Sequence, residues 1–377
     1  MQNGEKLNYS TPSKMNIKQI IDKKMPSFTE WFEAIGYEKT DEFRQEDNTK
    51  RDRLEFLFQE CSIPYDRPER MTARDIVDKT PLFQDIAKRK GNEPCALRLV
   101  PKKPNLPKLR QRGKTLNEYL ETWFPTLDIN PDDYKAEVVP HSDNTKYSST
   151  FVITDKGIYG EFVAGGHWQL SQGFFSHEPI TFLDKFNELK LSNTDEQMQK
   201  FIIKMINYLN ILPDKQNLLK ENLESKFTNT NYLKGYFEYV VWPDESGHFV
   251  DYNRIIPDMI GDINFKISDS NQKLTGTCAS PGQTSGKVKI VLDSQNTEFN
   301  EGEILVCPMT TVDYVPLMKK AGGIITEQGN ILSHAAIVSR EMKKPCIVGV
   351  KNVLNDLKDG DEIEMLTDDG KIILKNR

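Results

Sequence analysis

The sequence predicts a multidomain protein of mixed α/β (α+β) class, in which a two-lobed domain is followed by a smaller β/β/α domain. Three observations support this prediction. The chain has 377 residues, of which 37% are apolar and 10% are aromatic, so it can bury more than one core. Strand-like and helix-like runs are mixed between residues 51 and 265. Beyond residue 276, short β-type runs surround a single clear helix.

The charge balance sets limits on the partners. The formal net charge is −6, from 56 acidic and 50 basic residues, which gives no general attraction to nucleic acid or to an anionic membrane surface. We therefore expect neither as a partner, and any anion site must be local. The polar first 16 residues lack the apolar core of a signal peptide, and no apolar run approaches the roughly 20 residues that span a bilayer. These features predict a cytoplasmic protein.

The first 265 residues divide into two predicted parts. Residues 1–50 are polar with a few aromatic side chains, which predicts a short helical appendage. The two-lobed domain is expected at residues 51–265, and a long helical stretch is expected within it from about Ile180 to Ser225. Strands are predicted at residues 95–100, 135–140 and 149–154, a basic loop at 101–115, and a hairpin formed by 235–242 and 247–253.

A linker is predicted at residues 266–275, because this polar stretch lacks periodicity and is rich in Ser, Asp, Asn and Lys. The β/β/α domain follows at 276–377. Its helix is expected to begin at Ser333 and His334 and to end before Pro345.

The position of His334 favours phosphate chemistry. Ser333 is a good N-cap, so His334 takes the first helical position, beside unpaired N–H groups at the positive end of the helix dipole. This environment stabilises a phosphate near the ring and keeps the imidazole neutral and nucleophilic. The alternative is a histidine that only starts a helix, which on position alone is the commoner case.

The wider context resembles the phosphohistidine (mobile, or swivelling) domain of the phosphoenolpyruvate-utilising enzymes. Four segments carry the resemblance in the family's order: GTCASPGQTSGKVKIV, GEILVCPMTTVDYVPLMKKAGGIIT, GNILSHAAIVSREMKKPCIVGV and LKDGDEIEMLTDDGKI. The resemblance implies that His334 is the residue that is phosphorylated. The sequence differs from the usual motif of the family at two positions: Asn330 stands where a second glycine is usual, and Leu332 stands where threonine is usual.

Residues 52 to about 265 resemble, more weakly, the ATP-grasp domain that stands beside the mobile domain in these enzymes. The resemblance implies that Glu238, Asp251 and Asn253 hold magnesium ions, or manganese in their place, that bridge the phosphates of ATP. Adjacent antiparallel strands can bring Glu238 opposite Asp251, and Asp251 and Asn253 point to one face. Three oxygen ligands of the kind that magnesium prefers would then converge. The alternative is an exposed hairpin with ordinary alternation.

Basic residues supply possible phosphate contacts. Arg98 lies on a predicted strand and resembles the strand arginine of ATP-grasp domains, with a nucleotide-binding and catalytic role. Arg110 and Arg112 lie on the basic loop, which resembles the flexible loop that covers the phosphates. Glu137 stands where a hinge between the lobes would meet the adenine. A basic loop can, however, be no more than a solvated loop.

Together these features imply an ATP-dependent phosphotransferase that works through a phosphohistidine. By resemblance, the β-phosphate is donated, leaving AMP and phosphate. The domain that binds pyruvate in the larger enzymes does not fit in this sequence, so we expect a different small-molecule acceptor. Two alternatives stay open. The chain could be a phosphocarrier whose acceptor site lies on a separate subunit, or a regulatory protein with a degenerate nucleotide site. The oligomeric state is open.

Overall fold

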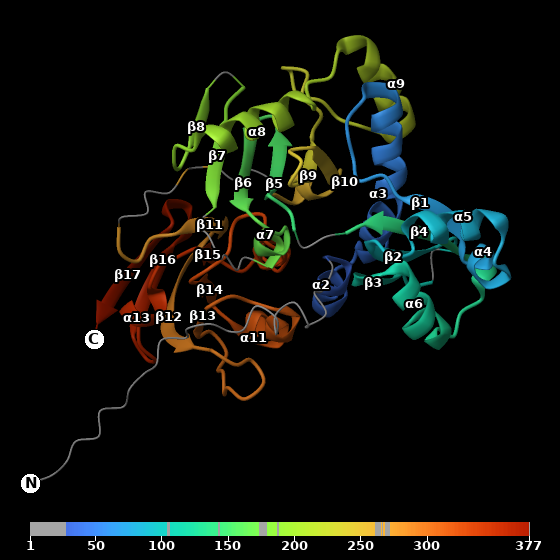
Figure 1. Cartoon of the computed structure of the whole chain (residues 1–377). Helices are drawn as coiled ribbons and strands as arrows, with labels where there is room; N and C mark the ends of the chain where they lie inside the picture. The colour runs from blue at the N-terminus through green and yellow to red at the C-terminus, as the bar shows by residue number, and fades with distance from the viewer. Residues whose placement is uncertain are drawn as a thin grey trace, which may run out of the picture.

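The computed structural model describes residues 28–103, 106–141, 144–172, 179–186, 188–260, 265, 267 and 272–376. For residues 171, 172, 334, 335 and 376 it describes the backbone alone. The described strands form three sheets, which belong to a first lobe, a second lobe and a C-terminal domain (Figure 1). This arrangement confirms the predicted fold class, a multidomain α/β protein with two lobes followed by a β/β/α domain.

The first lobe contains a sheet with the order β1-β4-β2-β3. Its helices start at threonine N-caps, and Thr72 and Thr115 form capping boxes with Asp75 and Glu118. Its elements are β1 (Glu69–Thr72), α4 (Ala73–Asp78), α5 (Pro81–Lys90), β2 (Pro94–Pro101), β3 (Leu109–Thr115), α6 (Leu116–Thr122), η1 (Phe124–Thr126), η2 (Pro131–Asp133) and β4 (Tyr134–Pro140).

The basic segment 101–115 is only partly a loop. Its second half is strand β3, which pairs with β2 from Leu99 opposite Leu109 to Pro94 opposite Thr115. The predicted loop is therefore wrong for these residues. The alternation of polar and basic residues there gives no apolar face, and pairing with the neighbouring buried strand β2 supplies the order that the local sequence lacks.

The second lobe contains a sheet with the order β10-β9-β5-β6-β7-β8. One face of the sheet carries aromatic side chains such as Phe151, Phe162 and Phe237, which pack under the helices α8 and α9. The elements are β5 (Tyr147–Thr154), β6 (Gly157–Ala164), α7 (Trp168–Gln172), β7 (Ile180–Asp184), β8 (Leu189–Leu191), α8 (Glu196–Asn207), α9 (Pro213–Leu223), β9 (Gly235–Val241), β10 (Gly247–Asn253) and α10 (Ile256–Ile260).

The helix expected from about Ile180 to Ser225 is wrong in its first part. Residues 180–184 and 189–191 are strands β7 and β8 at the sheet edge, and the helices begin only at Glu196 and Pro213. Strand β7 pairs with β6, whose residues lie some 20 positions earlier in the chain. Pairing over such a separation is not visible in local periodicity, which explains the error.

Two helices precede the lobes, α2 (Phe28–Ile35) and α3 (Thr40–Cys61). The predicted boundary between residues 50 and 51 falls inside α3, because one face of this helix stays buried from Phe43 to Leu57 and the helix ends only at Ser62, which has a left-handed backbone. The remaining part of the predicted appendage, residues 1–27, lies outside the described residues.

The C-terminal domain contains a mixed sheet with the order β11-β15-β14-β13-β12-β16-β17. The neighbouring strands β12, β13, β14 and β15 are parallel to one another. The pairs β11–β15, β12–β16 and β16–β17 are antiparallel. Its elements are β11 (Thr277–Ser280), β12 (Gln283–Ile290), β13 (Ile304–Cys307), η3 (Val312–Tyr314), α11 (Val315–Lys320), β14 (Gly323–Thr326), α12 (His334–Glu341), β15 (Cys346–Val348), α13 (Val353–Asp356), β16 (Glu362–Leu366), η4 (Thr367–Asp369) and β17 (Lys371–Asn376). All the β-type runs expected after residue 276 are strands.

The C-terminal domain lies against the second lobe (Figure 1). Helix α12 packs on α2 and α10, and apolar side chains from all three helices share one buried cluster with Val152 and Tyr159 of the second sheet. Of the predicted linker, the described residues 272–275 already pair with the C-terminal domain through Thr275 and Lys371.

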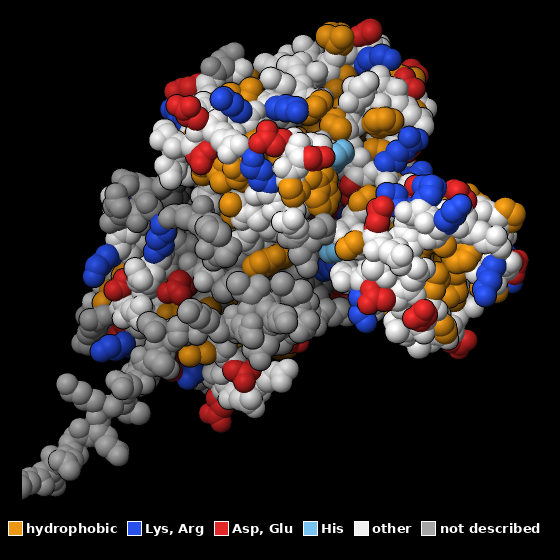
Figure 2. Space-filling view, viewed as in Figure 1, with side chains coloured by type: hydrophobic (Ala, Val, Ile, Leu, Met, Phe, Trp, Pro, Cys, Tyr) orange, Lys and Arg blue, Asp and Glu red, His pale blue; other side chains and the backbone are white. Residues whose placement is uncertain are grey.

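The surface carries mixed charges. On the face shown in Figure 2, acidic and basic side chains are interspersed, and an indentation sets the first lobe apart from the rest. Within the described parts of the chain, none of the helices has both the length and the apolar composition that crossing a bilayer would require.

Candidate functional site

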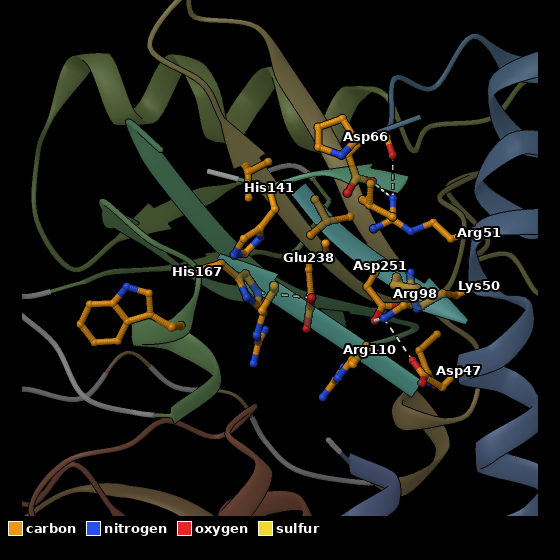
Figure 3. Close-up of a pocket in the computed structure, with 18 of the residues that line it drawn as sticks. Asp47, Lys50, Arg51, Asp66, Arg98, Arg110, His141, His167, Glu238 and Asp251 are labelled. Atoms are coloured by element: carbon orange, nitrogen blue, oxygen red, sulfur yellow. Dashed lines mark hydrogen bonds and ion pairs between the residues drawn. The ribbon is translucent and has the colours of Figure 1, made fainter. Parts of the chain in front are cut away.

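A cavity of about 300 Å³ lies between the two lobes, and Figure 3 shows the charged side chains that line it. Helix α3 closes one side, strands β2 and β3 of the first lobe form another, and β9 and β10 of the second lobe form a third. The charged residues and histidines in its lining are Asp47, Lys50, Arg51, Asp66, Arg98, Arg110, Arg112, His141, His167, Glu238 and Asp251. Asn253 also lines the cavity. Six of the eight predicted site residues therefore lie in its lining: Arg98, Arg110, Arg112, Glu238, Asp251 and Asn253.

The hairpin β9–β10 places two carboxylates together. Glu238 and Asp251 lie directly opposite each other in the antiparallel pairing, as the sequence predicted. A register shift between Phe249 and Asp251 marks a bulge immediately before this pair. Bulges re-aim side chains and are frequent beside functional sites, so this irregularity lies where both carboxylates turn toward the cavity.

The two carboxylates have partners of different kinds. The hydroxyl of Tyr236 donates to Glu238 Oε1 at 2.9 Å, and His167 Nε2 lies 3.4 Å from Glu238 Oε2. Asp251 Oδ2 accepts a hydrogen bond of 2.5 Å from the ammonium of Lys50. Lys50 thus supplies a positive charge to Asp251, one of the two carboxylates predicted to bind metal.

The predicted metal site fits this geometry in part. Magnesium usually takes one or two protein carboxylates and completes its shell with water and phosphate oxygens, and Glu238 and Asp251 meet that need. Asn253 Oδ1 instead accepts from the N–H groups of Ile255 and Ile256 at 2.9 and 3.0 Å, so it caps α10. Among the described residues, no group of three or more His, Cys, Asp or Glu side chains could hold a metal ion. The role of Asn253 as a ligand stays a prediction.

Three arginines predicted as phosphate contacts line the cavity, Arg98 from β2 and Arg110 and Arg112 from β3. Arg98 is only 6% exposed. Burial, reinforced by repulsion from Arg51, lowers the pKa of the Arg98 guanidinium. A buried guanidinium whose charge is incompletely compensated favours an anion in the cavity beside it.

Glu137 lies elsewhere than predicted. It stands opposite Arg98 on β4, its carboxylate is 3.8 Å from the Arg98 guanidinium, and it is not part of the cavity lining. The chain crosses from the first lobe to the second after Pro140, and at this crossing Val139, Pro140, His141 and Thr145 line the cavity. The hinge position assigned to Glu137 is therefore about three residues too early, and Glu137 instead supports Arg98.

The sequence reasoning missed the contribution of helix α3. Lys50 lies 3.1 Å from Asp47 and bonds Asp251, while Arg51 pairs with Asp66. Burial alone would lower the pKa of Lys50, but the neighbouring carboxylates of Asp251 and Asp47 outweigh it and raise the pKa. These side chains hold the helix against both lobes.

A signal for these residues exists in the sequence. Phe43, Asp47, Lys50, Leu54 and Leu57 recur at alternating steps of four and three, which places them on one face of a helix. Two charged residues within an apolar face are expected to be buried in pairs or at a site.

His334 is the first residue of α12, and Ser333 is its N-cap, with Ser333 Oγ accepting from Ala336 N at 3.3 Å. The predicted helix start is confirmed. The side chain of His334 lies outside the described part of the chain. Helix α12 packs on α2 and α10, and Phe28 and Ile256 of those helices line the cavity. The start of α12 therefore belongs to a helix cluster that borders the cavity. The role of His334 as the phosphorylated residue stays a prediction.

The fold and the site define a class of protein: a multidomain α/β protein in which a charged cavity between two lobes adjoins a C-terminal domain whose helix α12 begins with a histidine. Residues 299–370 match the family PEP-utilising enzyme, mobile domain, so this part of the chain is similar to that domain.

Known proteins with similar sequences match part of this chain. A probable phosphoenolpyruvate synthase of Staphylothermus marinus is 46% identical over 101 residues, which cover 26% of this chain and 12% of that protein. The uncharacterized phosphotransferase YvkC of Bacillus subtilis is 36% identical over 121 residues, which cover 32% of this chain and 15% of YvkC. The matches thus span only a small part of these relatives.

Among solved structures, the D-alanine-D-alanine ligase of Coxiella burnetii superposes on 55% of this chain and 48% of the ligase, with 11% identity and a TM-score of 0.28. A TM-score of this size carries no inference about the lobes.

Proposed function

We propose that the protein is an ATP-dependent phosphotransferase in which His334 accepts a phosphoryl group from nucleotide held between the lobes and passes it to an acceptor. The observation that carries this proposal is the place of His334, at the first position of α12 within the segment that matches the mobile domain family. The free N–H groups at a helix start favour a phosphoryl group attached to the ring.

The cavity supports a nucleotide as donor. Arg98, Arg110 and Arg112 offer guanidinium groups that can bind phosphate oxygens in pairs, and Lys50 adds an ammonium. Glu238 and Asp251 would hold magnesium, or manganese in its place. When bound, the metal would neutralise negative charge on the transferred group. A weak likeness of residues 52–265 to ATP-grasp domains agrees with this use of the cavity.

The transfer step needs little covalent chemistry from the protein. An imidazole nitrogen of His334 attacks phosphorus, so an N–P bond forms while a P–O bond breaks and its electron pair leaves with the nucleotide oxygen. By family resemblance we assign the β-phosphoryl group to His334. Water then releases the γ-phosphate, and the products are AMP and inorganic phosphate. The acceptor that finally takes the group from His334 is proposed to be a small molecule other than pyruvate.

Labelled nucleotide tests the proposal. The protein is incubated with magnesium and either β-labelled or γ-labelled ATP, and acid-labile label on the protein is measured. We expect the β label on wild type and none on His334→Ala, whereas His248→Ala, outside the cavity lining, keeps it. Absence of both labels from wild type would refute a phosphohistidine, and a stable γ label without the β label would refute the dikinase reaction.

Two further arms refine the assignment. Glu238→Gln and Asp251→Asn should each abolish labelling at limiting magnesium if they hold the metal. The acceptor is tested with a metabolite screen on labelled protein. If no metabolite removes the label from His334 and a second polypeptide does, the acceptor site lies on a separate subunit and the small-molecule acceptor is wrong.

A further inference from the structure

The C-terminal domain meets the second lobe through a polar contact four residues before His334. Asn330 is 3% exposed, and its Nδ2 donates to the carbonyl oxygen of Leu170 in α7 at 3.2 Å. The Asn330 side chain also acts on the carboxyl group of Glu161 on β6, whose pKa it lowers. Asn330 Oδ1 accepts from Leu332 N at 2.8 Å, which fixes the amide in its own loop. One side chain therefore joins the loop before α12 to helix α7 of the other domain.

Glu161 belongs to a row of side chains that crosses the second sheet. Asp251, Glu238, Thr150 and Glu161 lie opposite one another in turn on β10, β9, β5 and β6. Residues directly opposite on antiparallel strands share a face of the sheet, so Glu161 is on the face of the cavity carboxylates. Two strand spacings separate Glu161 from Glu238, which is roughly 10 Å. Asn330 thus docks at the end of a row that leads to the predicted metal site.

The environment of Glu161 makes this contact important. Glu161 is 6% exposed, and among the described residues its Oε2 has no hydrogen-bond partner. Burial raises the pKa of the Glu161 carboxyl to about 8, and the Asn330 side chain opposes that rise. A buried polar group that loses a partner is costly, so removal of the Asn330 amide leaves the Leu170 carbonyl less well satisfied and takes a polar neighbour from Glu161.

Much of the remaining contact of the C-terminal domain is apolar, although Lys319 Nζ also donates to the carbonyl oxygen of Ala34 in α2 at 3.1 Å. Helix α12 contributes Ala336 and Ile337 to the apolar cluster that it shares with Trp31 and Phe32 of α2. Apolar burial depends on area and hardly on angle, whereas an amide hydrogen bond weakens steeply when its geometry changes. The apolar cluster can hold the domain on the lobe, but Asn330 can define where on the lobe the start of α12 lies.

We propose that Asn330 is a positioning residue that fixes the docking register of the C-terminal domain on the second lobe, and so aims the start of α12 along the row Glu161–Thr150–Glu238 toward the cavity. The glycine that is usual at this position in the resembling family has no side chain for these contacts. The part of the inference that concerns transfer rests on the proposed function, while the docking register itself does not.

Hydrogen–deuterium exchange of the full chain without nucleotide tests the docking register. The variants are Asn330→Ala, Asn330→Gly and the nearly isosteric Asn330→Asp, and Asn355→Ala, an exposed asparagine of the same domain, is the control. We expect exchange in peptides 157–170 and 334–341 to become about 3- to 10-fold faster in the three Asn330 variants, as loss of one net hydrogen bond implies. The control should exchange like wild type.

The conservative variant Asn330→Asp separates the contact between the domains from the local role of Asn330. It keeps an oxygen that can accept from Leu332 N but has no amide to donate to the Leu170 carbonyl. We therefore expect its exchange in both peptides to be as fast as that of Asn330→Ala. A residue needed only for the shape of its own loop would leave Asn330→Asp at the wild-type rate.

The transfer readout is the rate at which His334 is labelled by ATP. Asn330→Ala should lower the maximal rate about 10-fold and leave the ATP concentration for half-maximal rate unchanged, because Asn330 does not line the cavity. Wild-type exchange in all Asn330 variants, or in Asn330→Asp alone, would overturn the proposal. If exchange responds as expected but wild type takes no label, the docking role stands and the proposed function fails.

Discussion

The buried carboxyl group of Glu161 predicts a specific pH dependence of stability. The folded protein retains this proton up to about pH 8, whereas the unfolded chain releases it near pH 4.5. The stability that the retained proton contributes is therefore complete below pH 4.5, and it is lost progressively as the pH rises toward 8. Glu161→Gln keeps a neutral side chain of the same shape at every pH, so it should not suffer this loss.

The magnitude follows from the shift. One pKa unit corresponds to about 1.4 kcal/mol, so the wild type loses up to about 5 kcal/mol from this group between pH 4.5 and pH 8. Between pH 5.5 and 7.5 the stability of Glu161→Gln relative to wild type should rise by about 3 kcal/mol. Relaxation around the group and entry of water make this an upper value.

Urea unfolding followed by tryptophan fluorescence at pH 5.5, 6.5 and 7.5 measures this effect. Glu301→Gln, at an exposed glutamate of the C-terminal domain, is the control and should track wild type at all three values. If the unfolding free energies of Glu161→Gln and wild type run parallel with pH, Glu161 does not hold a proton in the folded protein, and the buried interface around it has been misread.

Three other substitutions test the packing of the site. Lys50→Met leaves Asp251 without its ammonium partner and should cost about 3–5 kcal/mol in thermal melts with chelator, and added magnesium should restore part of this only if Asp251 binds the metal. Glu46→Ala removes a 2% exposed carboxylate that holds two arginines and ties α3 to the end of β10, so the urea midpoint should fall by a similar free energy. Gly160→Ala places a Cβ 2.3 Å from the Cβ of Phe151, and at least about 1–3 kcal/mol of stability should be lost in the same assay.

The hairpin that carries Glu238 and Asp251 could be predicted because its register is local. Strands β9 and β10 are separated by five residues. Buried and partly buried residues alternate in β10 from Gly247 to Val250, so a slip by one residue would turn Phe249 outward. The sequence therefore fixes which residues lie opposite each other. The start of α12 was predictable for the same reason, since Ser333 and His334 form a local N-cap signal.

The parts that could not be predicted depend on distant segments. Strand β7 is held by β6 and lies at a sheet edge, so its own periodicity is weak. Lys50 belongs to the cavity only because α3 packs on β10, and a lysine within a polar helix is normally solvated. The contact between Asn330 and the second lobe joins positions 160 residues apart, and local sequence carries no record of it.

The apolar cluster between the domains must be partly exposed before the C-terminal domain can leave the lobe and carry a phosphoryl group to a remote acceptor. Trp31 and Phe32 are 2% and 0% exposed, and they lie on α2, which a short turn ties to α3 and the lobes. An aromatic side chain buries about 150–250 Å², and each Å² is worth about 25 cal/mol, so exposing half of these two side chains costs about 4–6 kcal/mol.

A free energy of that size leaves only about one molecule in 10³ to 10⁴ with the C-terminal domain undocked. His334 can serve a remote acceptor efficiently only if that acceptor site offers α12 another apolar surface of similar area, whose contacts offset the loss. The other solution is an acceptor that reaches His334 while the domain stays docked. The variant Trp31→Ala, which weakens the contact of α12 with α2, distinguishes these two arrangements. It should speed turnover if the acceptor site is remote. It should slow turnover, or leave it unchanged, if the acceptor reaches His334 in the docked domain.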